Sequence, residues 1–214
     1  RYIEPSPVVG SQPSETLGNF DEDKIQNVTK TNEINGEKYG ISICEDCWNN
    51  KEFFNDTTLY SIDPIEELSK ENPDVFINCY ASPTRAKKEQ LKHNMLSFIA
   101  KKYNTPIVYV NQVGAIDNSS FDGSSRVFDA DGKLLARAKS FEEQFLIVNP
   151  KEKIGKIYPL TKGLDKSLKE QKVFTLEYES DLERTYKTIL QGIKDYFKKC
   201  GFKRAVLGLS GGLD

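Results

Sequence analysis

Two contiguous apolar runs with a helical segment between them limit the possible folds of this chain more than any other feature. Residues 74–79 and 106–113 are typical of buried strands, and residues 86–103 have the apolar spacing of an amphipathic helix. A strand, a helix and a strand in succession predict parallel pairing, because the chain must cross back over the sheet. The sequence therefore predicts an α/β fold. The apolar positions of the helix are Leu91, Met95, Phe98 and Ile99.

Turn-forming and capping residues predict the remaining elements of the first 150 residues. Asn-Gly and Asp-Gly dipeptides favour tight hairpin turns, and Asp-Pro favours a helix start. The expected elements are a long loop over 1–33, a turn at Asn35-Gly36, a strand over 39–43, a helix from Asp63-Pro64 to 70, a hairpin over 125–138 and a strand over 145–148.

The composition changes after residue 150, which predicts a division of the chain. Lysines, glycines and a proline replace the apolar runs over 151–171, and a capping box of Ser180 and Glu183 then begins a helix. A strand is expected over 205–209. We therefore predict a domain over 1–150, a linker over 151–176 and the start of a second domain over 177–214. The apolar stripe of the last helix is Leu182, Tyr186, Ile189, Leu190, Ile193 and Phe197.

Charge and composition exclude several classes of protein. The chain has 30 Lys and Arg against 32 Asp and Glu, so it lacks the basic excess that nucleic acid or an anionic membrane would favour. No apolar run reaches the ~18–20 residues of a membrane span. The four cysteines are too few and too scattered for a secreted disulfide scaffold. A cytoplasmic protein with no nucleic-acid or membrane partner is expected, cut at both ends, since it begins at Arg1 and stops inside a motif.

The first candidate chemical motif is the stretch from Gly40 to Trp48, which contains Cys44 directly after a strand. A cysteine in this position exposes its sulfur at the edge of a sheet, near backbone N–H groups that can stabilise an oxyanion. Cys47 cannot complete a zinc site, because there is no second C-x-x-C and His93 is the only histidine. Acidic neighbours disfavour a redox pair, so Cys47 is predicted to be a packing residue.

A nucleophilic Cys44 would need a base. His93 falls off the apolar face of its helix and is predicted to be solvated, which leaves a carboxylate base with a lysine as the common solution.

The second motif runs from Gly208 to Asp214 and contains Ser-Gly-Gly after an apolar strand. Bare backbone N–H groups at such a turn make a nest for a phosphate, and glycines permit the close approach. It is not a Walker loop, because no Gly-Lys-Ser/Thr follows.

These motifs resemble those of a known family. Ile43-Cys44-Glu45-Asp46-x-Trp48 is similar to the nucleophile motif of the nitrilase superfamily. The stretches 78–83 with Lys88, and 111–125, resemble the glutaminase domain of glutamine-dependent NAD⁺ synthetases. Ser-Gly-Gly-x-Asp214 resembles the pyrophosphatase loop of ATP-dependent amidotransferases.

The resemblance implies part of a nitrilase-like αββα sandwich, followed by the first helix and strand of a doubly wound α/β synthetase domain. Cys44 would attack the glutamine side-chain amide and release ammonia. ATP with Mg²⁺ would activate deamido-NAD⁺ for attack by that ammonia, in a homo-oligomer, and no metal ligand is expected in this chain. The implied glutamine-binding residues are Glu45, Trp48, Ser82 and Lys88, and the implied ATP-binding residues are Gly208, Leu209, Ser210, Gly211, Gly212, Leu213 and Asp214.

The sequence also departs from the family. The family's general-base Glu and its Lys lie upstream of Arg1, and most of the synthetase domain would follow Asp214, so the chain alone is expected to be inactive. Asn118 stands where the family often has Glu, and Lys87 where it often has Gly.

Three other functions stay open. They are a nitrilase-type amidase acting on a small amide, another ATP-dependent amidotransferase, and a binding or scaffold module in which Cys44 is inert.

Overall fold

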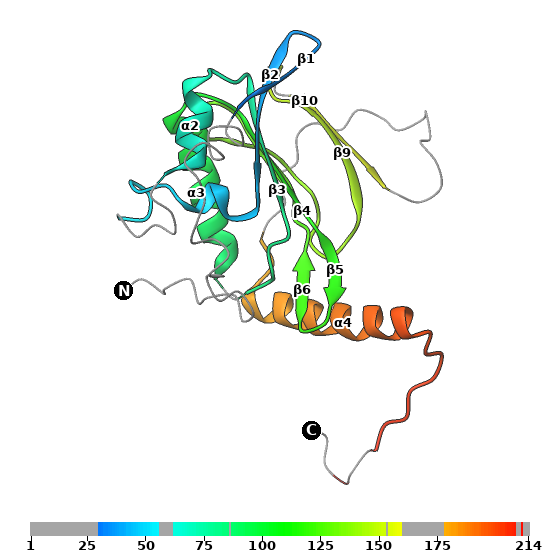
Figure 1. The fold of residues 1–214 in the computed structure, drawn as a ribbon. Helices are drawn as coiled ribbons and strands as arrows, with labels where there is room; N and C mark the ends of the chain where they lie inside the picture. Colours follow the sequence, from blue (N-terminus) through cyan, green and yellow to red (C-terminus); the bar gives the residue numbers. More distant parts are fainter. Residues whose placement is uncertain are drawn as a thin grey trace.

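The central feature of the molecule is a six-stranded sheet in the order β1-β2-β3-β4-β7-β8 (Figure 1). The computed structural model describes residues 30–55, 62–85, 87–152, 154–159, 178–208 and 211. The middle strands β2, β3 and β4 run parallel, and β1, β7 and β8 pair antiparallel. The strands are β1 Asn32–Ile34, β2 Glu37–Ile43, β3 Val75–Tyr80, β4 Ile107–Asn111, β7 Arg126–Phe128 and β8 Leu134–Arg137.

Two helices connect the parallel strands, which confirms the α/β fold class. Helix α2 (Pro64–Lys70) lies between β2 and β3, and helix α3 (Lys88–Lys102) between β3 and β4. The α2 start is the expected one, because the Asp63 carboxylate accepts the backbone N–H groups of Ile65 at 3.0 Å and Glu66 at 3.3 Å. Both helices lie on the same side of the sheet (Figure 1).

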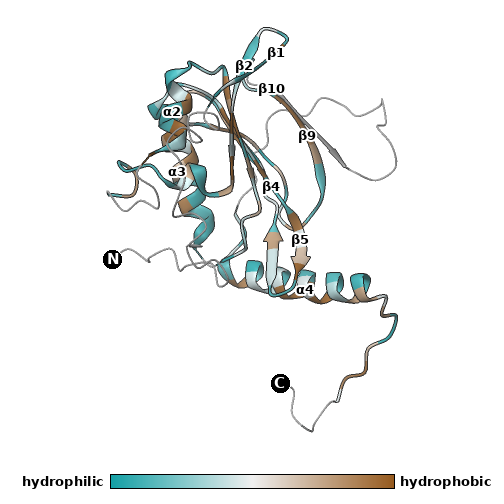
Figure 2. Cartoon of the chain, in the orientation of Figure 1, coloured by the Kyte–Doolittle hydropathy of each residue, from teal (hydrophilic) through white to brown (hydrophobic). Residues whose placement is uncertain are grey.

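The core lies between these helices and the sheet, where apolar residues gather (Figure 2). Gly40 of β2 allows the fully buried Phe76 ring to approach the backbone, since a Cβ at Gly40 would stand 2.8 Å from Phe76 Cδ1. The core residues include Cys47, Phe54, Ile65, Leu68, Phe76, Met95, Leu96, Ile99, Ile107, Tyr109 and Phe128.

The buried face of α3 differs from the expected one. Met95 and Ile99 are fully buried as predicted, but Leu91 and Phe98 are only partly covered. The charged Lys92 occupies the buried face instead, with 1% of its surface exposed. The buried face of α3 is rotated from the predicted one because Lys92 forms ion pairs with buried carboxylates. A pattern of apolar residues does not reveal such pairs.

The expected hairpins form. Asn35 and Gly36 have φ of 53° and 80°, the positive values that a tight hairpin turn requires, and join β1 to β2. The loop predicted over 1–33 is wrong at residues 32 and 33, which belong to strand β1. Residues 1–29 lie outside the described part. The hairpin of β7 and β8 and the strand β9 (Gln144–Asn149) also agree with the sequence.

The second half of the chain contains one strand that the sequence did not predict and lacks one that it did. Strand β10 (Ile154–Pro159) lies within the predicted linker and pairs antiparallel with β9. The division of the chain into two domains and a linker stays a prediction. Residues 205–208 form no strand, and Val206 and Leu207 are 101% and 83% exposed. An apolar run becomes a strand only where another strand supplies hydrogen bonds, and no described strand lies beside this one.

Helix α4 (Asp181–Cys200) lies across a separate hairpin of β5 (Val113–Ile116) and β6 (Ser119–Asp122) (Figure 1). It docks through polar groups: the Asp195 carboxylate accepts the Ala115 N–H at 2.7 Å. Most of the predicted apolar stripe points outward instead, with Leu182 81%, Ile189 58% and Ile193 54% exposed, whereas Leu190 and Phe197 are half-buried. In the part of the chain that the structure describes, no helix is long and apolar enough to cross a membrane.

Candidate functional site

Cys44 stands at the carboxyl end of β2, where the chain turns sharply. Its φ of 55° lies in the left-handed region, and a short 3₁₀ helix, Cys44–Trp48, begins there. The Asp46 carboxylate accepts the Ile43 N–H at 2.7 Å and so holds the turn. Cys44 is exposed, as the motif predicted for a cysteine after a strand. A positive φ in a residue other than glycine is strained, and such strain occurs preferentially at functional sites.

The surroundings of Cys44 favour the protonated thiol. Partial burial raises the pKa of Cys44, the Glu45 carboxylate raises it further, and the positive charge of Lys88 lowers it. The expectation that acidic neighbours disfavour the thiolate is confirmed. A group with this pKa is a weak nucleophile at neutral pH unless a base removes its proton.

Cys47 is a core residue, as predicted. It is fully buried, its thiol donates to the Cys44 carbonyl oxygen over 3.8 Å, and burial raises its pKa. Within the described ranges, no group of three or more His, Cys, Asp or Glu side chains could hold a metal ion.

Lys88 begins helix α3 and reaches over the Cys44 turn. Its Nζ atom lies 5.0 Å from the centre of the Trp48 ring and 5.8 Å from that of Tyr80. Burial, followed by the charges of Lys92 and Arg85, lowers the pKa of Lys88 to about 8. The structure therefore brings Cys44, Trp48 and Lys88 together, with Glu45 close enough to affect both titrating groups.

Ser82 lies beyond the end of β3, at the same edge of the sheet. Strands β2 and β3 are parallel with Ile43 opposite Cys79, so the residues after both strands emerge on one edge. Ser82 is fully buried, and its backbone N–H donates to Asn111 Oδ1 at 2.8 Å. The edge that holds Cys44 thus also holds the second predicted segment.

His93 is not the solvated residue that its helical position predicted. Its ring is half-buried against Phe128, with the ring centres 5.0 Å apart, and its Nδ1 atom shares a hydrogen bond with the Tyr178 hydroxyl at 2.6 Å. Burial lowers the pKa of His93, and Arg126 and Arg137 lower it further. Tyr178, which precedes α4 in the sequence, covers the face of α3 that carries His93. The spacing of residues within α3 could not predict this contact.

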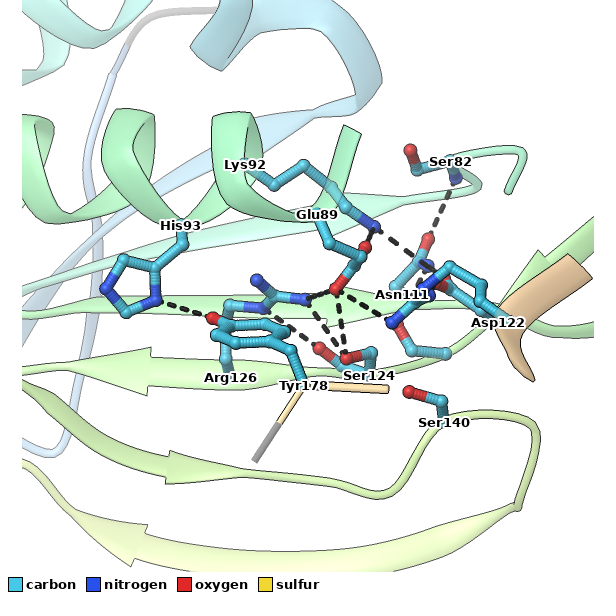
Figure 3. Close-up of polar contacts among 12 residues, drawn as sticks. Ser82, Glu89, Lys92, His93, Asn111, Asp122, Ser124, Arg126, Ser140 and Tyr178 are labelled. Atoms are coloured by element: carbon cyan, nitrogen blue, oxygen red, sulfur yellow. Dashed lines mark hydrogen bonds and ion pairs between the residues drawn. The ribbon is translucent and has the colours of Figure 1, made fainter. Parts of the chain in front are cut away.

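A buried cluster of ion pairs includes Glu89 and Lys92 of α3, the helix that begins with Lys88, and the sequence did not predict it (Figure 3). The Glu89 carboxylate accepts a hydrogen bond from Arg126 Nη2 at 2.6 Å and also forms an ion pair with Lys92 Nζ. Asp122 pairs with Arg184 and lies 3.7 Å from Lys92 Nζ. Burial raises the pKa of Glu89, but Lys92, Arg126 and Arg184 together outweigh it and hold the pKa below its usual value. The cluster comprises Glu89, Lys92, Asp122, Arg126, Arg137, Glu179 and Arg184.

Only weak sequence signals marked this cluster. Glu89 and Lys92 are three residues apart, a spacing that usually indicates a pair on the solvated face of a helix. Arg126 and Arg137 lie on facing strands of one hairpin, directly opposite each other. Like charges at opposed positions are unfavourable, which could have indicated a buried acidic partner between them.

Little of the predicted ATP loop falls within the described residues. Gly208 and Gly211 are exposed, and nothing lies within 4 Å of a Cβ built on either. Leu209, Ser210, Gly212, Leu213 and Asp214 lie outside the described part.

Comparison with known proteins finds the same family that the motifs resemble. No protein-family model matches the chain. A glutamine-dependent NAD⁺ synthetase from Synechocystis is 36% identical over 177 residues, which are 83% of this chain and 29% of that protein. One from Thermotoga maritima is 31% identical, over 85% of this chain and 33% of its own length.

A solved structure agrees with both sequence matches. The glutamine-dependent NAD⁺ synthetase from Acinetobacter baumannii, in complex with ADP, superimposes with a TM-score of 0.61 and 28% identity, over 80% of this chain and 28% of that one. The chain resembles part of a glutamine-dependent NAD⁺ synthetase. It spans about a third or less of the length of these relatives. These matches confirm the resemblance drawn from the motifs, and the α/β fold class agrees with it.

Proposed function

We propose that this chain carries the glutamine-hydrolysing site of a glutamine-dependent NAD⁺ synthetase, an ATP-dependent ligase that makes an amide. The observation that carries the proposal is the exposed Cys44 in a left-handed turn, beneath a lysine that lies over Trp48. A strained, exposed cysteine beside a partly buried cation is typical of a nucleophile rather than of a packing residue.

In the proposed reaction, the Cys44 sulfur attacks the side-chain amide carbon of glutamine. The thiol proton passes to the departing nitrogen, so ammonia leaves and a thioester remains, which water hydrolyses to glutamate. Because the pKa of Cys44 is raised, a base must take the thiol proton as attack begins. The family's glutamate would be that base, and Glu45, Trp48, Ser82 and Lys88 would form the glutamine pocket.

At the loop Gly208–Asp214, the carboxylate of deamido-NAD⁺ would attack the α-phosphate of ATP and release pyrophosphate. The ammonia would then attack the adenylated carboxylate and displace AMP, which gives the amide of NAD⁺. The outward apolar stripe of α4 supports this arrangement, because such a stripe needs a second unit to cover it. Mg²⁺ would accompany ATP and the pyrophosphate that ATP releases. The homo-oligomer and the cytoplasmic location stay predictions.

Labelling the longest natural form of the protein with a glutamine-mimicking diazoketone tests the proposal. Cys44 should be alkylated with saturation kinetics, and glutamine should protect it. Cys79 and Cys200 are also exposed, so they are controls within the same chain and should react slowly and without saturation. Labelling of Cys44 no faster than of Cys79 and Cys200, measured by peptide mass spectrometry, would refute the nucleophile.

The amidase alternative predicts a different protecting ligand. If a small amide is the substrate, propionamide should protect Cys44 at concentrations at which glutamine does not. Equal failure of both amides to protect would favour the scaffold module with an inert Cys44.

A further inference from the structure

The first turn of α4 is tied to the body of the molecule by one buried guanidinium, that of Arg184. It is 3% exposed, although most of the helix around it is open to solvent. Its nitrogens contact three carboxylates: Asp122, Glu179 at 3.0 Å and Glu89 at 3.5 Å. A buried guanidinium that contacts several carboxylates fixes their relative positions more tightly than an ion pair on the surface does.

The contact with Asp122 leads to Ser82. The other oxygen of Asp122 accepts Asn111 Nδ2 at 3.1 Å, and Asn111 Oδ1 accepts the Ser82 N–H at 2.8 Å (Figure 3). All of these groups are buried, so each has few alternative partners. Moving the Asp122 carboxylate would therefore shift the Asn111 amide and the backbone of Ser82.

The contact with Glu89 leads to Lys88. Glu89 follows Lys88 in the first turn of α3, and this helix start is poorly held by its own residues. Lys87 at the N-cap has a left-handed φ of 62° and makes no side-chain capping bond. The ion pairs of Glu89 with Lys92, Arg126 and Arg184 hold the first turn instead, and with it the direction in which Lys88 leaves the helix.

We propose that Arg184 is a positioning residue, which sets Ser82 and Lys88 beside Cys44 and so couples the docking of α4 to glutamine binding. This inference rests on the proposed function. Because α4 leads into the predicted ATP loop, movement of the loop's domain would reach the glutamine site through Arg184. The coupling runs in both directions, since any change in affinity at one site must be matched at the other.

The far end of α4 provides a matched control. There, Asp195 accepts the Ala115 N–H at 2.7 Å and Lys199 donates to the Ala115 carbonyl oxygen. These bonds dock the same helix onto the hairpin of β5 and β6 without contacting the ion cluster. Loosening this end perturbs docking but leaves the contacts to Glu89 and Asp122 in place.

The experiment compares Arg184→Met, Arg184→Lys and Asp195→Asn in the longest natural form of the protein. We expect Arg184→Met to raise the KM for glutamine about tenfold or more, because displacement of binding groups by an ångström has effects of this size. Alkylation of Cys44 by iodoacetamide, which needs no glutamine pocket, should change less than about twofold. Arg184→Lys should raise the KM for glutamine less than Arg184→Met does, and Asp195→Asn should leave it near the wild-type value.

A second measurement does not depend on the proposed function. Acylation of Lys88 by acetic anhydride, followed across pH by mass spectrometry, should give a midpoint near the pKa of about 8 in the wild type. In Arg184→Met, and partly in Arg184→Lys, the midpoint should move toward the ordinary lysine value as Lys88 swings into solvent. Asp195→Asn should leave it unchanged.

The outcomes separate the two proposals. An unchanged Lys88 midpoint in both Arg184 variants, or an equal shift in Asp195→Asn, would overturn the positioning role. A shifted midpoint in a protein that never hydrolyses glutamine would refute the proposed function alone. If Arg184→Met does not fold, Arg184→Lys carries the same comparison.

Discussion

Replacing Glu89 by Gln tests whether the buried ion cluster stabilises the fold. In the wild type, three carboxylates face four cations, and Glu89 alone contacts Lys92, Arg126 and Arg184. Gln is nearly isosteric with Glu, so the substitution removes a charge and leaves the packing almost unchanged. Two carboxylates would then face four buried cations.

The expected loss of stability follows from this imbalance. Removing one partner of a buried ion pair costs about 3–5 kcal/mol, because the remaining charge stays desolvated without compensation. For a chain of this size, that corresponds to a fall in melting temperature of roughly 6–20 °C. The control is Glu67→Gln, which breaks an exposed pair with Lys70 and should cost about 0.5 kcal/mol or less.

The pH dependence gives a second test of the same residue. Because the pKa of Glu89 is held below the ordinary value of 4.5, its stabilisation is fully present above pH 4.5 and is lost as pH falls toward the folded pKa. We expect the difference in free energy of unfolding between wild type and Glu89→Gln, measured with urea, to be smaller at pH 3 than at pH 7. A loss below about 1 kcal/mol at pH 7, or a gap that does not depend on pH, would show that the cluster does not stabilise the fold as argued.

Two backbone positions give further predictions. Gly40→Ala should cost about 1–3 kcal/mol in urea unfolding, because the added Cβ would stand 2.8 Å from the Phe76 ring, which has no room to move; an unchanged midpoint would mean that β2 and Phe76 pack less closely. Lys87→Gly should stabilise the protein by about 1 kcal/mol or less, since relief at a φ of 62° exceeds the added chain entropy. The control Lys101→Gly, inside the same helix, should lose about 1 kcal/mol, and a loss at both positions would contradict the strain at Lys87.

The departure of Lys87 from the family pattern has a structural meaning. The resemblance stated from the sequence implies Gly at this position, and the backbone here has the left-handed conformation that favours Gly. The fold therefore imposes the conformation, and the lysine side chain tolerates it. Since Lys87 begins the helix that carries Lys88, the strain lies directly beside the candidate glutamine pocket.

Helix α4 shows why amphipathicity alone does not locate a contact. Its spacing predicted a conventional apolar stripe, but the described part of the molecule binds the polar side of the helix, through Arg184 and Asp195. The outward Leu182, Ile189 and Ile193 are left for another surface.

Local sequence patterns predicted the features that depend on neighbouring residues. These are the parallel strands around α3, the cap of α2 at Asp63, the turn at Asn35-Gly36, and Cys44 exposed after its strand. Each follows from periodicity, capping or turn chemistry over a few residues. The resemblance to one family also depended on local motifs.

The packing of distant elements sets which charges are buried and which apolar residues are exposed. Lys92, Arg126 and Arg184 look like surface residues in the sequence, yet carboxylates from distant elements make their burial favourable. Residues 205–208 look like a strand, yet they pair with nothing among the described residues. The physical reason is the same in both cases: a buried charge and a strand each require a partner, and the partner's position is set by the fold of the whole chain and not by the residues beside it in sequence.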